Sequence, residues 1–182
     1  MLPPGHIAAG FLTAEALLKI AKPDLPAAEL RHLLWWGVFF GFAPDLDMFY
    51  WFLKSRAFKM DPRAGNHRQY LSHAPVLWLA AGLIIYAAAP SDYVRMIGLL
   101  LWLGSWSHFL LDSIEYGIMW LWPLSTKRFA LKSTDGILAE PEGKFFDYWR
   151  KVVKSYSASL SFYLELLVVL AAVTAYFLNF KF

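Results

Sequence analysis

The sequence predicts an all-α protein, a polytopic transmembrane bundle of about five helices with one further amphipathic helix at the membrane interface. Hydrophobic residues make up 58% of the 182 residues and charged residues only 17%, whereas soluble domains average roughly 45–50% and about 25%. Residues 74–91, 96–111 and 166–180 contain no Asp, Glu, Lys or Arg. A crossing helix needs roughly 17–25 apolar residues, so these stretches approach the required length. A soluble helical bundle is the alternative.

Breaks rich in proline and glycine divide the chain into its predicted helices. We expect helices over about residues 6–21, 28–43, 74–89, 93–113 and 159–178. The second helix should stop before Pro44, because proline disfavours a helical conformation in the residue before it. We predict one domain over residues 1–182, with core motifs in 5–125, an interfacial segment in 126–158 and a terminal membrane helix in 159–180.

The interfacial prediction rests on residues 144–156, KFFDYWRKVVKSY, where apolar side chains recur at helical spacing. Arg150, Lys151 and Lys154 supply the polar side. We expect a helix that lies in the interface, held by its aromatic residues and by anionic lipid. A cap packed on the bundle is the alternative. Residues 48–53 are expected to form a wall or an interfacial turn.

The direction of the helices places seven acid and imidazole groups at one end of the bundle. The turns KPDLP and PSD are short, so the chain should form two helical hairpins. Each hairpin brings the start of its first helix and the end of its second helix to the same side of the bundle. Those ends carry His6, Asp45, Asp47, His67, His73, His108 and Asp112, whereas His32 falls at the opposite end. Because 12 of the 17 basic residues lie in the loops on the same side, the positive-inside rule makes this side cytoplasmic.

Two pairs within this set have the spacing of metal ligands. Asp45 and Asp47 share one side of the chain if PDLD is extended, and a divalent cation would keep both charged in apolar surroundings. The alternative is a helix-ending turn whose aspartates cap backbone amides. His108 and Asp112 lie four residues apart, on one face of a helix. The alternative for this pair is a hydrogen bond between histidine and carboxylate.

The other histidines of the set, His6, His67 and His73, are also potential metal ligands. Neutral imidazole is the common zinc ligand, and oxygen-rich sites also suit manganese or magnesium. Seven ligands exceed what one tetrahedral zinc ion uses, so two divalent ions, or one ion with a catalytic carboxylate, fit better. Arg68, beside His67, could clamp a phosphate with its planar guanidinium; the alternative is an anchor at the membrane surface. His6 taken alone could be incidental.

The order of these motifs resembles a known family. His6 with Gly10, then PDLD, then HR followed by SH, then HFLLD, then a glycine and WPLS, resembles the YdjM-type membrane-bound metal-dependent hydrolases. These are small inner-membrane proteins, some described as LexA-binding. The resemblance covers about residues 5–125. It implies that the seven acid and imidazole residues form a metal site and that Gly117, Trp122 and Pro123 serve packing.

Together these features predict a hydrolase in a prokaryotic inner membrane, with its site facing the cytoplasm. A metal-activated water would attack a phosphoester-containing lipid or another amphiphile, and ester or amide cleavage of a lipid is a variant. Asp47 and Arg68 are the predicted catalytic residues. Asp47, or alternatively Asp45 or Asp112, would accept the proton of the water, and Arg68 would stabilise developing charge. A metal-ion carrier or sensor, or a scaffold that binds a soluble regulatory partner around a structural metal, are the alternatives. We expect membrane lipids and a small amphiphilic substrate as partners, and no nucleic acid.

Overall fold

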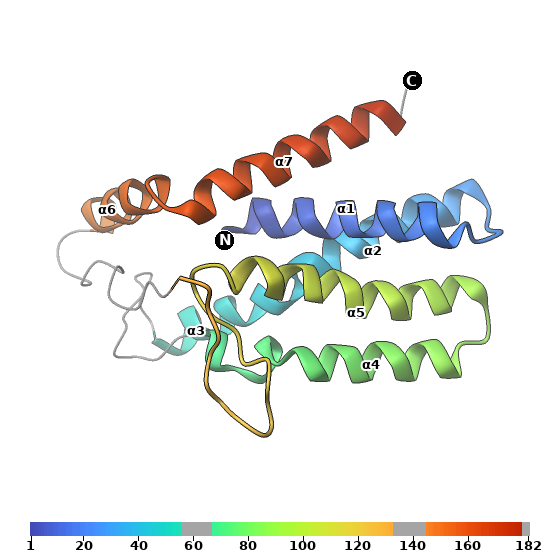
Figure 1. Ribbon diagram of the computed structural model, residues 1–182, viewed down its shortest axis with the longest axis horizontal. Coiled ribbons are helices and arrows are strands. Elements are labelled where there is room, and N and C mark those ends of the chain that lie inside the picture. Colours follow the sequence, from blue (N-terminus) through green and yellow to red (C-terminus); the bar gives the residue numbers. More distant parts are fainter. Residues whose placement is uncertain (56–66, 133–144, 180–182) are drawn as a thin grey trace.

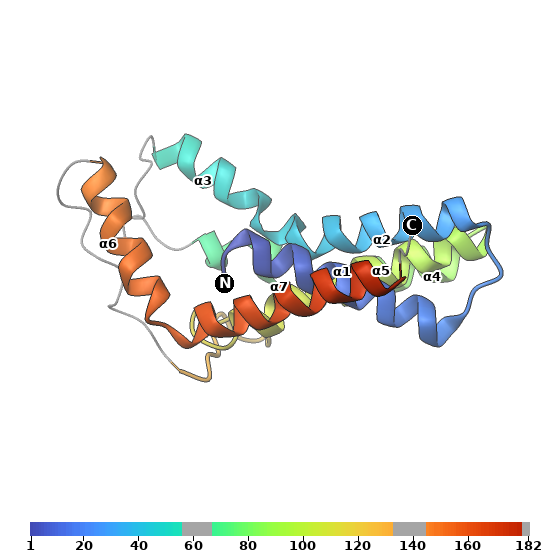
Figure 2. The ribbon, with the colours of Figure 1, turned by 90° about the horizontal axis from the view of Figure 1, so that it is seen from above.

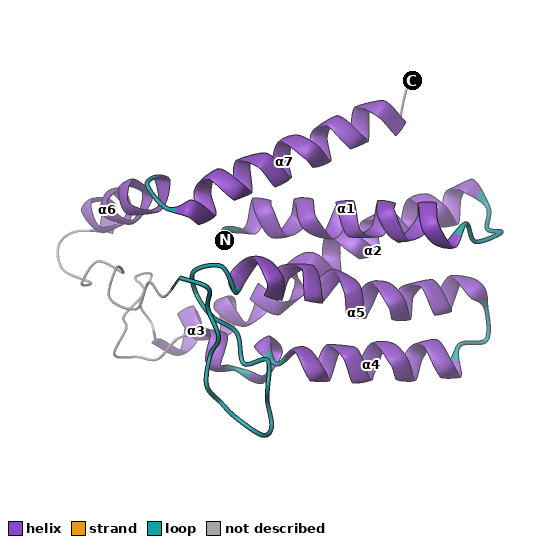
Figure 3. Ribbon diagram, in the orientation of Figure 1, coloured by secondary structure: helices purple, strands orange, loops and turns teal. Residues whose placement is uncertain are grey.

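The computed structural model describes residues 1–55, 67–132 and 145–179, and its regular elements there are helical (Figures 1 and 3). The α-helices of these ranges are α1 (Pro3–Ala21), α2 (Ala27–Phe42), α3 (Asp47–Ser55), α4 (Pro75–Ala88), α5 (Asp92–Asp112), α6 (Phe145–Ser157) and α7 (Leu160–Asn179). Short 3-10 turns occupy η1 (Ala43–Leu46), η3 (His67–Gln69) and η4 (Leu71–His73). The all-α prediction is confirmed, and helices occupy the five long segments expected from the sequence at nearly the expected bounds.

Local sequence explains where these helices begin and end. α1 starts with two prolines, which suit a first turn because the amides there have no partner within the helix. It ends at Lys22, which adopts a left-handed conformation with φ of 45°. Before α5, the Ser91 hydroxyl accepts a hydrogen bond from the Val94 amide and caps the helix. α2 gives way to η1, which contains Pro44.

Two antiparallel hairpins, α1–α2 and α4–α5, form the body of the molecule, and α7 packs against α1 (Figure 1). Their turns lie at the end opposite the N-terminus. The core between them contains Leu33, Phe40 and Leu100. α1 and α2 touch through their backbones, because a Cβ placed on Gly10 would lie only 2.2 Å from the Gly37 carbonyl oxygen. The hairpin arrangement predicted from the short turns is therefore confirmed.

Among the described helices, α5 and α7 are long and apolar enough to cross a membrane. α5 has a mean hydropathy of 1.3 over 21 residues, and residues 160–178 of α7 have a mean hydropathy of 1.9. α4 is apolar but shorter. Much of α7 is exposed on the surface of the chain, as expected for a helix that faces lipid.

In each of two local segments, one of the alternatives left open by the sequence was wrong. Residues 48–53 belong to α3 rather than to a turn, and Asp47 in its first turn suits the positive end of the helix dipole. The PDLD segment is not extended, because it enters the 3-10 turn η1 directly from α2. A helix is present as α6 where the interfacial helix was predicted, and Figure 2 shows α3 and α6 projecting from the end of the bundle that holds the N-terminus. Residues 133–144 of the interfacial segment lie outside the described residues.

Candidate metal centre

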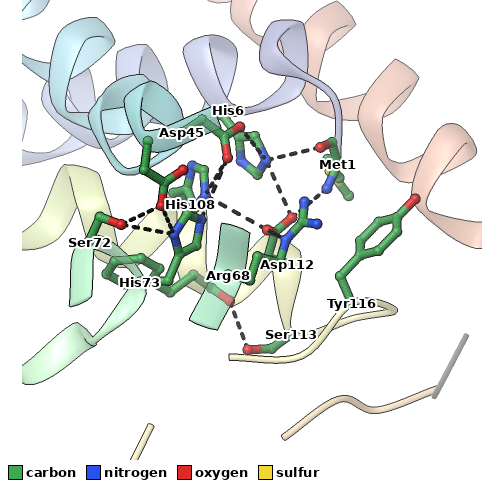
Figure 4. A network of polar contacts seen from close by, with 12 residues as sticks. Met1, His6, Asp45, Arg68, Ser72, His73, His108, Asp112, Ser113 and Tyr116 are labelled. Atoms are coloured by element: carbon green, nitrogen blue, oxygen red, sulfur yellow. Dashed lines mark hydrogen bonds and ion pairs between the residues drawn. The ribbon is translucent and has the colours of Figure 1, made fainter. Parts of the chain in front are cut away.

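The helix ends identified from the sequence meet in one buried cluster. His6 comes from α1, Asp45 from η1, His73 from η4, and His108 and Asp112 from the last turns of α5 (Figure 4). Asp45 is 3% exposed and the other four side chains are fully buried. A buried cluster of acids and imidazoles is costly unless its charges are compensated, so this arrangement suggests a specific ligand.

The contacts of His108 indicate that this ligand is a cation. Its Nδ1 lies 3.0 Å from the Gly41 carbonyl oxygen, which can only accept, so Nδ1 carries the proton and Nε2 the lone pair. This Nε2 lies 3.6 Å from Asp45 Oδ1 and 3.8 Å from Asp112 Oδ2. It has no hydrogen-bond partner among the described residues. Three electron-pair donors thus face one another, and a cation between them would bind the His108 lone pair and interact favourably with both carboxylates.

The two other imidazoles approach the same carboxylates. His6 Nε2 lies 3.4 Å from Asp112 Oδ1 and donates to the Met1 carbonyl oxygen at 3.2 Å, and the His6 ring stacks on the His108 ring with a centroid separation of 3.7 Å. His73 Nε2 lies 3.6 Å from Asp45 Oδ1. Two overlapping groups of potential metal ligands result, one of His6, His108 and Asp112 and the other of Asp45, His73 and His108.

The spacing of these atoms suits a divalent metal. Bond lengths of about 2.0–2.2 Å to nitrogen and oxygen in a tetrahedral site place neighbouring ligand atoms roughly 3.4 Å apart. The nitrogen-to-oxygen separations above, between 3.4 and 3.8 Å, are close to this value. Both groups include His108, whose one lone pair can ligate one ion. The two groups therefore describe one centre with a shared ligand.

Asp112 is also compensated by cations of the chain. Its Oδ1 accepts a hydrogen bond from the Met1 ammonium group at 2.5 Å, and its Oδ2 accepts one from Arg68 Nε. Arg68 is buried and lies over the Tyr116 ring, 4.5 Å from the ring centroid. Burial alone would lower the pKa of Arg68, but the carboxylates of Asp112 and Asp45 outweigh burial and raise it. Burial raises the pKa of Tyr116 to about 12.

The charges around Asp45 keep its carboxylate ionised. Burial alone would raise the pKa of Asp45, but the imidazoles of His73, His108 and His6 outweigh burial and lower it. Burial lowers the pKa of His73, but the Asp45 and Asp47 carboxylates outweigh burial and raise it. Asp45 is therefore ionised at neutral pH, which is the form that binds metal.

Asp47 and His67 lie differently from the other predicted ligands. Asp47 Oδ2 accepts hydrogen bonds from Ser72 Oγ and, at 3.0 Å, from His73 Nδ1, and Asp47 belongs to neither ligand group. Carboxylates behind ligating histidines commonly orient the ring in this way. His67 begins η3, and its side chain lies outside the described part of the structure.

Several residues around the cluster were not predicted from the sequence. Met1 has no sequence signature, whereas Tyr116 follows Asp112 by four residues and Ser72 directly precedes His73. Glu165 of α7, which contacts the first turn of α1, directly precedes the uncharged residues 166–180. An acid in an apolar helix is itself a signal of function.

The fold and the cluster define a helical protein of membrane type with a buried histidine and aspartate centre at one end of its bundle. The chain belongs to the YdjM inner membrane protein family, whose model matches residues 1–181. The match extends beyond the motifs in 5–125 and includes α6 and α7. No curated protein and no solved structure matches the chain significantly.

Proposed function

We propose that the protein is a membrane-embedded, metal-dependent hydrolase that acts on a phosphoester-containing lipid or another amphiphile at the cytoplasmic interface. The observation that carries this proposal is His108 Nε2, a buried lone pair that faces oxygens of Asp45 and Asp112. A shared proton would draw nitrogen and oxygen to about 2.7–2.9 Å. The separations of 3.6 and 3.8 Å instead leave room for a divalent ion between them.

Asp45, His73 and His108 would hold this ion, with His6 and Asp112 on its other side. Three imidazoles favour zinc, with manganese or magnesium as alternatives. A second ion would use His6 and Asp112 and would need a further ligand, for which His67 is the candidate from the sequence. When bound, the metal supplies Lewis acidity and a water molecule with a pKa of about 7.

The chain's own residues would then orient the reactants and accept the proton. The Asp45 carboxylate, which lies among the imidazoles, would accept a proton from the attacking water. Asp47 would act through His73 by fixing its ring, rather than by contacting the reacting atoms. Arg68, fixed by Asp112 and by the Tyr116 ring, would stabilise negative charge that develops on phosphoryl oxygens.

The surroundings of the centre support a substrate delivered by the bilayer. At this end of the bundle α3 exposes Phe49, Tyr50 and Leu53, and α6 exposes Phe146 and Val153. Basic residues dominate the loops on the same side, which supports a cytoplasmic position for this end. In this proposal α1, α2, α4, α5 and α7 would cross the membrane. A metal carrier would need polar groups along the helices, whereas the buried histidines and aspartates of the cluster gather at one end.

Elemental analysis of the purified protein tests the metal centre. We expect stoichiometric metal in the wild type and its loss in Asp45→Ala and His108→Ala. His32→Ala is the matched control, because it removes an imidazole at the other end of the bundle and should keep the metal. A wild type without metal after growth in metal-replete medium would refute the centre.

Conversion of phosphoester lipids in vesicles to their hydrolysis products, an alcohol with either a phosphomonoester or free phosphate, tests hydrolysis with the same proteins. A metal-loaded wild type that forms neither product from any phosphoester lipid would favour the scaffold or carrier. The topology can be tested with single cysteines at Arg63 and Ser125, because the native chain has none. Labelling of both positions from outside the cell would contradict a cytoplasmic site.

A further inference from the structure

We infer that Glu165 of α7 is a positioning residue for His6, because it caps the first turn of α1 from another helix. The inference rests on the proposed metal centre, to which it adds α7. It concerns a carboxylate that lies outside both ligand groups.

The first turn of α1 lacks a cap of its own. Helix N-termini leave amides without partners, and α1 has no side-chain hydrogen bond from its N-cap residue, Leu2. The two prolines that follow have no amide proton. The amides of Leu2 and Gly5 remain, and each lies 3.2 Å from a different oxygen of Glu165. The Gly5 amide also donates to the Leu2 carbonyl oxygen at 3.1 Å, so Glu165 is a second acceptor for Gly5 and an acceptor for the Leu2 amide.

The residues around Glu165 hold its carboxylate at the first turn of α1. The side chain is largely buried, and the Tyr156 hydroxyl at the end of α6 donates a hydrogen bond to Oε2. Gly5 leaves the space that the carboxylate occupies, since a Cβ there would lie 2.9 Å from Glu165 Cγ. A negative charge at a helix N-terminus also interacts favourably with the helix dipole. An ionised acid in an apolar helix is otherwise costly.

The capped turn carries His6 into the metal centre. His6 directly follows Gly5, and its Nε2 lies 3.4 Å from Asp112 Oδ1 while its ring stacks on His108. A shift of the first turn therefore moves the His6 imidazole relative to Asp112 and His108. Glu165 is the contact through which α7 holds that imidazole in place, although 160 residues separate Glu165 from Gly5.

A double-mutant cycle on zinc affinity, with a chromophoric chelator as competitor, tests the inference. Glu165→Gln replaces one acceptor oxygen by a donor that faces an amide, and we expect zinc to bind about 10–100-fold more weakly, the range typical of residues that orient ligands. In the His6→Ala background the same change should have no further effect. Glu29→Gln, a matched substitution near the opposite end, should leave the affinity unchanged.

Two measurements on the metal-free protein, amide hydrogen exchange and the imidazole resonances, keep this test separate from the proposed function. Glu165→Gln should lower the protection of the Leu2 and Gly5 amides from hydrogen exchange and should shift the His6 imidazole resonances, but not those of His32. Tyr156→Phe, a milder change, should act in the same direction. Unchanged exchange at both Leu2 and Gly5 would overturn the cap, and an equal loss of affinity in the His6→Ala background would overturn positioning through His6. If the wild type binds no zinc but Glu165→Gln changes both amide exchange and the His6 resonances, the proposed function is refuted and the cap by Glu165 is supported.

Discussion

Asp47→Asn is the substitution that best separates a metal ligand from a residue that orients one. In the structure Asp47 accepts a hydrogen bond from His73 Nδ1 at 3.0 Å and a second from Ser72 Oγ. His73 Nε2 then points toward Asp45, 3.6 Å from its Oδ1. The amide side chain of this variant would keep a neutral acceptor for His73 but would remove the charge that makes the imidazole a stronger ligand.

The contacts of Asp47 set the size of the effect. A hydrogen bond to a charged group contributes about 1.5–3 kcal/mol. Loss of an orienting carboxylate typically weakens metal binding about 10–100-fold, which corresponds to roughly 1.4–2.7 kcal/mol. Asp47→Asn keeps one acceptor and should lie near the tenfold limit, whereas Asp47→Ala should approach the hundredfold limit. Ser72→Ala should weaken binding less than either, because the contact from His73 remains.

Competition with a chromophoric chelator measures these affinities in detergent-solubilised protein. Asp24→Asn, in the turn between α1 and α2, is the control for removal of a carboxylate far from the centre. Asp45→Asn should abolish stoichiometric binding. If Asp47→Asn abolishes binding as completely as Asp45→Asn, then Asp47 is a direct ligand and the reasoning is wrong. It is equally wrong if neither Asp47 variant changes the affinity.

Three further outcomes follow from the packing, the charges and the proposed metal. Gly10→Ala should lower the free energy of unfolding by about 1–3 kcal/mol, because its Cβ meets the Gly37 carbonyl at 2.2 Å, and thermal denaturation would show the loss. Burial alone would raise the pKa of Glu115, but Ser161 and the amides at the start of α7 lower it. Glu115 therefore stabilises the fold above its ordinary pKa of 4.5, and this stabilisation is lost as the pH falls through the lowered value. Glu115→Gln should flatten the acid limb of a plot of stability against pH, and an unchanged limb would contradict this assignment. Chelation of the metal should lower the melting temperature, and added zinc should restore it.

Sequence reasoning predicted which helix ends meet, because the short turns KPDLP and PSD leave no arrangement other than two hairpins. It did not predict the partner of each carboxylate. PDLD is compatible with an extended strand or a 3-10 turn, and only the turn observed in η1 brings Asp47 behind His73. The role of Glu165 depends on the packing of α7 against α1, a contact that no local pattern specifies.

The two-hairpin construction has a consequence for the order of biosynthesis. The α1–α2 hairpin, with His6 and Asp45, leaves the ribosome first, but neither ligand group is complete until residues 108 and 112 of α5 have been made. Chains interrupted within the first hairpin therefore lack a centre that can be loaded. In the proposed enzyme, metal acquisition is a late event of maturation, and hydrolytic activity begins only after the second hairpin has joined the first in the membrane.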